Sequence, residues 1–208
     1  MRRGGKGRGR GNATGTQKVG AGRLRGRKLL ALPPELEQVR PTGSRVRSAI
    51  YDRLQAEVVG ARVLDLFAGT GALAIEAVSR GAASAVCVEK SAPVVAFLRQ
   101  QVAGLGVDGE IEVVRADAVD FLADGGRSPA RSQFSLVLVD PPYADGELYG
   151  SVLTALGGWL QPDAVVVCEL MPAAVPGLVW PRGFRLEARR EHGQTALDFL
   201  RYEGPDAP

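Results

Sequence analysis

The chain has 208 residues, of which 45% are apolar and 24% are charged. This length suits one globular domain with a small appendage and is too short for two full-sized domains. No run approaches eighteen apolar residues and the start of the chain has no apolar segment, so we expect a cytoplasmic protein with neither a membrane span nor a secretory signal.

The net charge of +3 is unevenly distributed along the chain. Residues 1–28 contain ten Arg or Lys and no Asp or Glu, so the remaining residues have 16 basic and 23 acidic side chains. A basic, glycine-rich segment cannot bury enough apolar surface to fold alone, and such tails commonly bind nucleic acid. A solubilising tail would have the same composition. We predict a disordered tail over residues 1–18 and a polyanionic partner.

An N-terminal appendage is expected over residues 19–58. The run RLRGRKLLAL (23–32) predicts a short extended or hairpin element. The following run RPTGSRVRSAIYDRLQ (40–55) predicts a helix, since Val46, Ile50 and Leu54 fall on one helical face. Residues 59–208 form the main domain in this division.

The main domain alternates short apolar runs with helical stretches such as 71–81 and 91–106. Near-continuous apolar runs are typical of strands buried on both faces of a parallel sheet. After residue 181, two strand-like runs joined by HGQ predict a terminal antiparallel hairpin. The fold class is therefore α/β: a doubly wound, mostly parallel sheet with ligands at the carboxyl ends of its strands. The parallel strands are expected at RVLDLF (62–67), SAVCVE (84–89), EIEVVR (110–115), FSLVLVD (134–140) and AVVVCEL (164–170).

The run DLFAGTG (65–71) ends the first predicted strand and opens a helix. Its two glycines let the backbone turn tightly and approach a ligand, and Glu89 ends the second strand, where a carboxylate can hold ribose hydroxyls. Asp65 would repel a pyrophosphate but attract a cation. S-adenosylmethionine carries an ammonium and a sulfonium and no phosphate, so this loop favours it over a dinucleotide.

Asp117 follows the third predicted strand. Its carboxylate could bind an adenine amino group at the strand end, or it could cap the helix AVDFLA (118–123). The residues alone leave the two roles open.

The tetrapeptide Asp140-Pro141-Pro142-Tyr143 follows the fourth strand. Two prolines fix an extended backbone and remove two N–H donors, which leaves the Asp140 carboxylate and the Pro141 carbonyl as rigid acceptors. Two acceptors on the hydrogens of a nucleobase amine favour a pyramidal nitrogen with its lone pair aimed at a methyl donor. Tyr143 can stack on an unstacked base.

These motifs, in this order, resemble the class I S-adenosylmethionine-dependent methyltransferases, and more narrowly the bacterial 16S rRNA (guanine-N2)-methyltransferases of the RsmD type. The similarity spans about Arg23 to Tyr202 and includes RGRKL (25–29), RPTxxRVR (40–47), the glycine loop and DPPY. The resemblance implies a Rossmann-like fold and methylation of a guanine in 16S rRNA or the small ribosomal subunit. The protein would act as a monomer without a metal.

The resemblance also implies roles for individual residues. Cofactor contacts are expected from Asp65, Phe67, Gly69, Thr70, Gly71, Glu89, Lys90, Asp117 and Ala118, catalytic contacts from Asp140, Pro141, Pro142 and Tyr143, and RNA contacts from Arg25, Arg27, Lys28, Arg40, Arg45 and Arg47. The chain departs from the family pattern at Ser44 and Ser48, where the family usually has acids. That departure bears on how Arg45 and Arg47 are oriented.

Three other functions share parts of this pattern. A DNA adenine or cytosine amino-methyltransferase would keep the motif order but usually adds a target-recognition region. A non-enzymatic RNA-binding or ribosome-assembly protein could use the same fold, and an NAD-dependent dehydrogenase would share the glycine loop but leaves Asp65 and DPPY unexplained.

Overall fold

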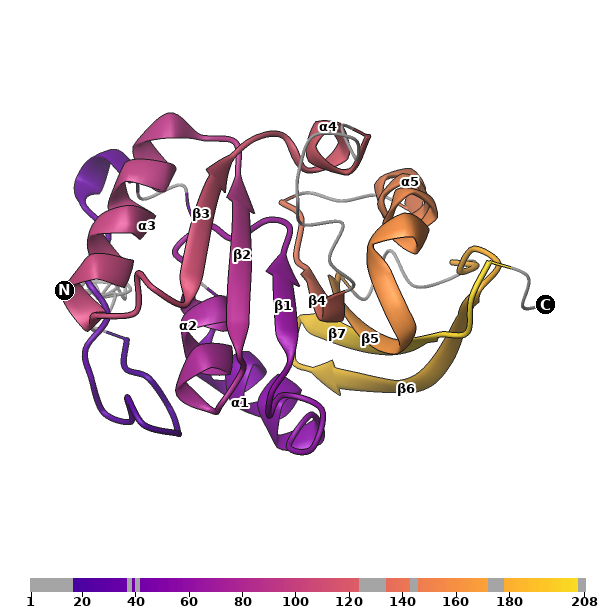
Figure 1. The fold of residues 1–208 in the computed structure, drawn as a ribbon, viewed down its shortest axis with the longest axis horizontal. Helices are drawn as coiled ribbons and strands as arrows, with labels where there is room; N and C mark the ends of the chain where they lie inside the picture. Colours follow the sequence, from indigo (N-terminus) through magenta and orange to yellow (C-terminus); the bar gives the residue numbers. More distant parts are fainter. Residues whose placement is uncertain are drawn as a thin grey trace, which may run out of the picture.

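The computed structural model describes residues 17–36, 39, 42–123, 134–142, 146–171 and 178–205. Its centre is a seven-stranded sheet with the strand order β3-β2-β1-β4-β5-β7-β6 (Figure 1). Strands β3, β2, β1, β4 and β5 are parallel, whereas β7 pairs antiparallel with both β5 and β6. The doubly wound fold with a terminal antiparallel hairpin is therefore confirmed.

The strands form close to their predicted positions. The inner parallel strands β2 and β4 are apolar at nearly every position because both faces of the sheet are covered by helices, whereas Glu112 and Arg115 of the edge strand β3 are exposed. The strands are β1 (Arg62–Asp65), β2 (Ser84–Glu89), β3 (Ile111–Arg115), β4 (Phe134–Val139), β5 (Leu160–Leu170), β6 (Phe184–His192) and β7 (Thr195–Tyr202).

The helices also agree with the sequence patterns. α5 occupies the interval between β4 and β5, one of the intervening segments expected to be helical. α3 follows Ser91 and ends at Gly106, whose φ of 71° is the left-handed conformation that glycine adopts at helix ends. The helices are α1 (Ser44–Arg53), α2 (Ala72–Ser79), α3 (Ala92–Leu105), α4 (Ala118–Ala123) and α5 (Gly146–Leu156), with 3₁₀ turns at Pro34–Leu36 and Gly157–Trp159.

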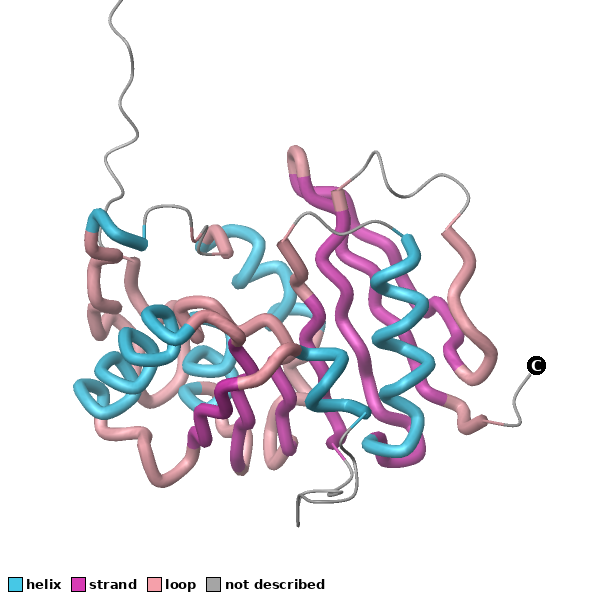
Figure 2. Tube along the Cα trace, turned by 90° about the horizontal axis from the view of Figure 1, so that it is seen from above, coloured by secondary structure: helices cyan, strands magenta, loops and turns pink. Residues whose placement is uncertain are grey.

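Two hydrophobic layers lie on opposite faces of the sheet. Alternate strand residues point to opposite faces, so Val63 packs in one layer with α1, α2 and α3, while Leu64 packs in the other with α4 and α5. Figure 2 shows helices on either side of the strands. None of the helices in the described residues is long and apolar enough to span a membrane.

The N-terminal segment shares the core of the main domain. Val19, Leu24 and Leu29 are buried in the same cluster as Ile50 of α1 and Val63 of β1. Lys18 and Lys28 form an isolated antiparallel bridge, which agrees with the expected hairpin-like element. The predicted boundary at residue 59 therefore does not divide the hydrophobic core.

Candidate active site

The carboxyl ends of β1 and β4 form the crevice at which a ligand is expected. The chain runs outward from β1 to β2 and β3 on one side and continues through β4 and β5 on the other, so the strand order reverses between β1 and β4. Asp65 ends β1, Glu89 ends β2, and Asp140 follows β4. The fold therefore gathers the sequence-predicted carboxylates at one edge of the sheet.

The glycine loop between β1 and α2 depends on glycine geometry. Gly69 and Gly71 have φ angles of 50° and 72°, which L side chains rarely adopt. A Cβ atom on Gly71 would lie 2.3 Å from Leu98 Cδ1. The tight turn therefore leaves backbone N–H groups at the start of α2 available to a ligand.

Glu89 holds this loop in place. Its Oε2 accepts a hydrogen bond from the Gly69 amide at 3.1 Å, and its Oε1 accepts one from the Ser91 amide at 2.8 Å. Each carboxylate oxygen has a second lone pair, so these bonds leave Glu89 able to accept the hydroxyls of a ribose. The side chain thus links the ends of two loops as well as offering a ligand contact.

Replacing Glu89 with alanine is expected to weaken cofactor binding about ten- to a hundredfold, because a charge-assisted hydrogen bond contributes roughly 1.5–3 kcal/mol. Glu89→Gln retains one acceptor and is expected to lose less. Isothermal titration with S-adenosylmethionine measures both, with Glu112→Gln on the exposed face of β3 as a control. An unchanged dissociation constant for Glu89→Ala would show that the carboxylate serves only the loop.

Asp65 is a buried carboxylate whose two oxygens have no hydrogen-bond partner among the described residues. Burial, followed by the nearby charge of Asp140, raises its pKa from 3.8 to about 7. The backbone amides of Ala74 and Phe67 lie near the carboxylate without meeting hydrogen-bond geometry, and they offset only part of this effect. An unpaired buried carboxylate favours a nearby cation. This property, together with the glycine turn, fits a positively charged cofactor.

The raised pKa of Asp65 predicts that stability of the ligand-free protein depends on pH. Between about pH 4 and 7 the folded state retains a proton that the unfolded state has lost, so the free energy of unfolding falls as the pH rises, by on the order of 4 kcal/mol. Asp65→Asn cannot titrate and should lack this contribution. Urea unfolding of both proteins at several pH values measures it, and identical pH dependence would contradict the prediction.

The remaining predicted cofactor residues lie around this crevice. Thr70 is buried, and its carbonyl accepts a hydrogen bond from the side chain of Gln101. Asp117 is exposed and its Oδ1 accepts the Val119 amide at 2.9 Å, which is the capping geometry. Capping leaves its other oxygen available, so the ligand role stays a prediction. Phe67 is partly buried, Lys90 is exposed and Ala118 is buried.

Asp140 lies at the centre of the predicted catalytic motif. Its Oδ2 accepts a hydrogen bond from the Thr42 hydroxyl at 3.0 Å, and burial raises its pKa. Pro141 is buried and Pro142 is exposed, whereas Tyr143 lies outside the described residues. Thr42 belongs to the segment before α1, so the N-terminal region reaches the edge of the sheet beside Asp140.

Glu169 is a further carboxyl group at this site that the sequence patterns did not indicate. Val139 of β4 pairs in register with Cys168 of β5, so Asp140 and Glu169 follow as the next neighbours and their carboxyl groups lie within hydrogen-bonding reach of each other. Burial and the charge of Asp140 raise the pKa of Glu169 to about 8. The only sequence signal is an acid inside an otherwise apolar strand, which is unusual unless the acid has a partner.

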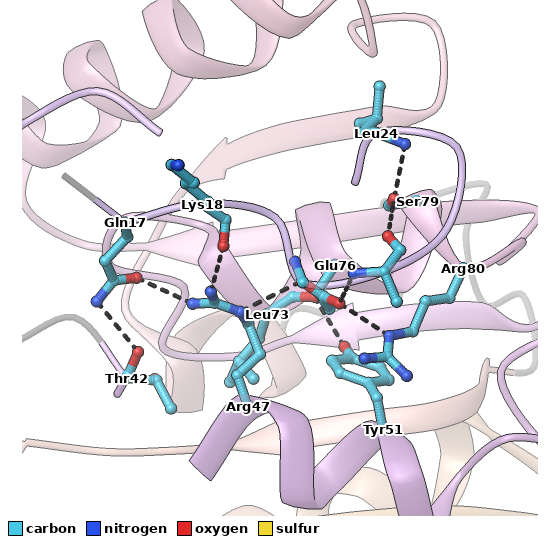
Figure 3. A network of polar contacts seen from close by, with 12 residues as sticks. Gln17, Lys18, Leu24, Thr42, Arg47, Tyr51, Leu73, Glu76, Ser79 and Arg80 are labelled. Carbon is cyan, nitrogen blue, oxygen red and sulfur yellow. Dashed lines mark hydrogen bonds and ion pairs between the residues drawn. The ribbon is translucent and has the colours of Figure 1, made fainter. Parts of the chain in front are cut away.

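The predicted RNA contact of Arg47 is wrong, because the structure buries its side chain. It is 2% exposed, and its Nε lies 3.3 Å from Glu76 Oε2 (Figure 3). Its two terminal nitrogens donate to the Gln17 side chain at 2.9 Å and to the Lys18 carbonyl at 2.7 Å. The guanidinium is therefore buried and engaged by protein partners on all three of its nitrogens, so it is not available to RNA.

Glu76 connects this network to the N-terminal segment. Its carboxylate accepts the amides of Gly20 at 2.7 Å and Ala21 at 2.9 Å, and it also pairs with Arg80 at 2.8 Å. Because Glu76 lies on α2, directly after the glycine loop, the network fixes residues 17–21 against the element that begins the cofactor crevice. Arg47 is thus a structural residue.

The other predicted RNA contacts are compatible with solvent exposure. Arg25, Arg27, Lys28 and Arg45 are exposed, and Arg40 lies outside the described residues. Arg45 lines an open groove of about 510 Å³ between α1 and the end of β6. The groove is lined by Ser44, Arg45, Ser48, Ala49, Asp52, Arg53, Arg190 and His192.

Comparison with known proteins assigns the chain to a family. The family model described as "Conserved hypothetical protein 95" matches residues 17–201. Ribosomal RNA small subunit methyltransferase D of Escherichia coli K12 is 36% identical over 194 residues, which cover 92% of this chain and 93% of that protein. The protein of the same name from Haemophilus influenzae is 33% identical over 76% of this chain and 80% of its own length.

Solved structures show the same fold. A putative methyltransferase, yhhF, from Escherichia coli superposes with a TM-score of 0.76 at 31% identity, covering 91% of this chain and 99% of that one. An RNA methyltransferase from Salinibacter ruber, solved with S-adenosyl-L-homocysteine, covers 81% of this chain and 97% of its own with a TM-score of 0.62, and at 17% identity it supports the fold alone. The chain belongs to the family of the ribosomal RNA small subunit methyltransferase D proteins, which are S-adenosylmethionine-dependent methyltransferases.

Proposed function

We propose that the protein transfers a methyl group from S-adenosylmethionine to the exocyclic N2 amine of a guanine in 16S rRNA, in the cytoplasm and as a monomer. The observation that carries this proposal is the position of Asp140, an acceptor held at the strand-order reversal beside the crevice of Asp65 and Glu89. The relatives named as small-subunit rRNA methyltransferases support the choice of RNA.

Some residues of the crevice are proposed to bind the cofactor and others to bind the target base. When bound, S-adenosylmethionine supplies an electrophilic methyl group. Asp65 balances its positive charge and Glu89 accepts its ribose hydroxyls, while Asp140 and the Pro141 carbonyl accept the two amine hydrogens of the guanine. Tyr143 is proposed to stack on the base, as the DPPY motif suggests. No general base is needed, since the amine proton can leave after the methyl group arrives.

Exposed cations in the N-terminal segment and beside α1 are proposed to bind the RNA backbone. Arg25, Arg27 and Lys28 lie in the N-terminal segment, and Arg45 lies two residues before Arg47 on the exposed face of α1. Arg190, which shares the groove with Arg45, adds a cation that the sequence analysis did not include, and His192 lines the same groove. Phosphate contacts of this kind position RNA without reading its sequence.

Methylation of 16S rRNA tests the proposal directly. Purified protein is incubated with labelled S-adenosylmethionine and either naked 16S rRNA or small ribosomal subunits, and the products are digested to nucleosides and identified by mass spectrometry. N2-methylguanosine in either substrate is the expected product. Methylation only of DNA, or a methylated base other than guanine, would overturn the proposal.

The basic N-terminal tail is expected to add RNA affinity without contributing to chemistry. Gln17 and Lys18 hold Arg47, so the informative truncation removes residues 1–16 and five basic side chains. Each lost phosphate contact should flatten the slope of log affinity against log salt by roughly 0.7–0.9, while turnover at saturating RNA persists. Filter binding over a salt series measures this, and an unchanged slope would show that the tail makes no phosphate contact.

A further inference from the structure

The pairing of Asp140 with Glu169 gives the proposed methyl-transfer site a second carboxyl group. The strands β4 and β5 are adjacent and parallel, and residues paired in register on neighbouring strands point to the same face of a sheet. The two carboxyl groups lie within hydrogen-bonding reach of each other, and a hydrogen bond between them requires that one of them carry a proton. Two ionised carboxylates at this distance would repel each other.

The surrounding donors decide which carboxyl group is ionised. The Thr42 hydroxyl donates to Asp140 at 3.0 Å, which stabilises the charged form of Asp140. Thr195 lies 3.5 Å from Glu169 Oε1, at the limit of a hydrogen bond, and Glu169 Oε2 is buried with no donor among the described residues. The proton therefore resides on Glu169, which donates to Asp140.

Glu169 is contacted from two neighbouring elements, α5 and β7. Tyr149 of α5 donates its hydroxyl to the Glu169 carbonyl, and Thr195 begins β7, the next strand of the sheet. Among the described residues, the charged group recorded beside the pair is also acidic, since the charge of Asp140 raises the pKa of Asp65 on β1. Asp198 of β7 lies near Tyr149 and is neutralised by Arg189. No cation of the described residues is recorded against either carboxyl group of the pair, so a proton is what relieves their repulsion.

We propose that Glu169 is a positioning residue for methyl transfer, which donates its proton to Asp140 and thereby keeps Asp140 ionised and turned toward the substrate amine. This inference rests on the proposed function, because it assigns Asp140 to the amine. A singly protonated pair presents one fixed acceptor to the incoming base. Loss of the proton would place two negative charges there and let Asp140 turn away from its repelling neighbour.

The test is the pH dependence of kcat in wild-type protein, Glu169→Gln and Glu169→Ala, with Glu112→Gln as a matched exposed control. Wild type and the control should lose activity as the pH rises through about 8, where Glu169 releases its proton. Glu169→Gln keeps a neutral donor, so it should retain kcat within a few-fold at pH 7 and lose this alkaline decline. Glu169→Ala should lower kcat about a hundredfold with the KM of the cofactor little changed.

A second measurement separates this inference from the proposed function. In the infrared spectrum of wild type, one protonated carboxylic-acid band should disappear as the pH rises through about 8. Glu169→Gln should have no carboxylic-acid band that titrates near this pH. If this band is present but no rRNA guanine is methylated, the proposed function fails and the protonated pair stands. If guanine is methylated and Glu169→Gln retains the wild-type alkaline decline, the positioning role is overturned.

Discussion

Replacing Asp140 with alanine is expected to lower the rate of methyl transfer at least about a hundredfold and to leave S-adenosylmethionine affinity within a few-fold. A group that orients a reacting amine contributes to the rate of the bound complex and little to cofactor binding. Asp140 accepts a hydrogen bond from Thr42 and lies beside Glu169, and among the described residues no hydrogen bond joins it to the glycine loop. Single-turnover kinetics and calorimetry together measure the two effects.

Asp140→Asn tests the acceptor role without changing the shape of the side chain. Its amide can present an N–H donor to the amine, which is itself a donor, so this variant should lose most of the activity as well. Asp120→Asn, on the exposed side of α4, is the matched control and should turn over normally. Normal turnover by either Asp140 variant would remove Asp140 from the catalytic assignment.

Replacing Arg47 with alanine is expected to destabilise the protein by about 3–5 kcal/mol. The change leaves the buried Glu76 carboxylate with Arg80 as the one cation paired with it among the described residues. The change also removes the donors to Gln17 and Lys18, so the N-terminal segment loses its attachment to α1. Denaturant unfolding followed by circular dichroism measures the loss in free energy of unfolding.

Arg45→Ala on the same helix is the matched control. Arg45 is exposed and has no ion pair or hydrogen bond recorded among the described residues, so its loss should change stability by no more than about 0.5 kcal/mol. The same variant should weaken RNA binding, whereas a folded Arg47 variant should bind RNA nearly as well as wild type. Equal stability of the Arg45 and Arg47 variants would contradict the buried network.

The sequence by itself determined the architecture, the glycine loop and the acids at the strand ends of the site. Runs such as SAVCVE and FSLVLV are apolar at successive positions because both faces of a parallel strand are covered, and that local signal located β2 and β4 within a residue. Gly69 and Gly71 were recognisable because a tight turn requires positive φ angles, and glycine adopts these angles readily since it has no Cβ atom. Asp65, Glu89 and Asp140 followed from their places at strand ends.

Only the tertiary structure decided which side chains meet. Arg45 and Arg47 look alike in sequence, but α1 turns Arg47 inward because Glu76, on α2, offers the buried carboxylate that neutralises it. Likewise, the sequence shows Glu169 only as a residue of a buried strand. The pairing of β5 with β4 places its side chain beside Asp140. Strand order and register bring these partners together from 29 positions apart, and no local periodicity encodes such pairings.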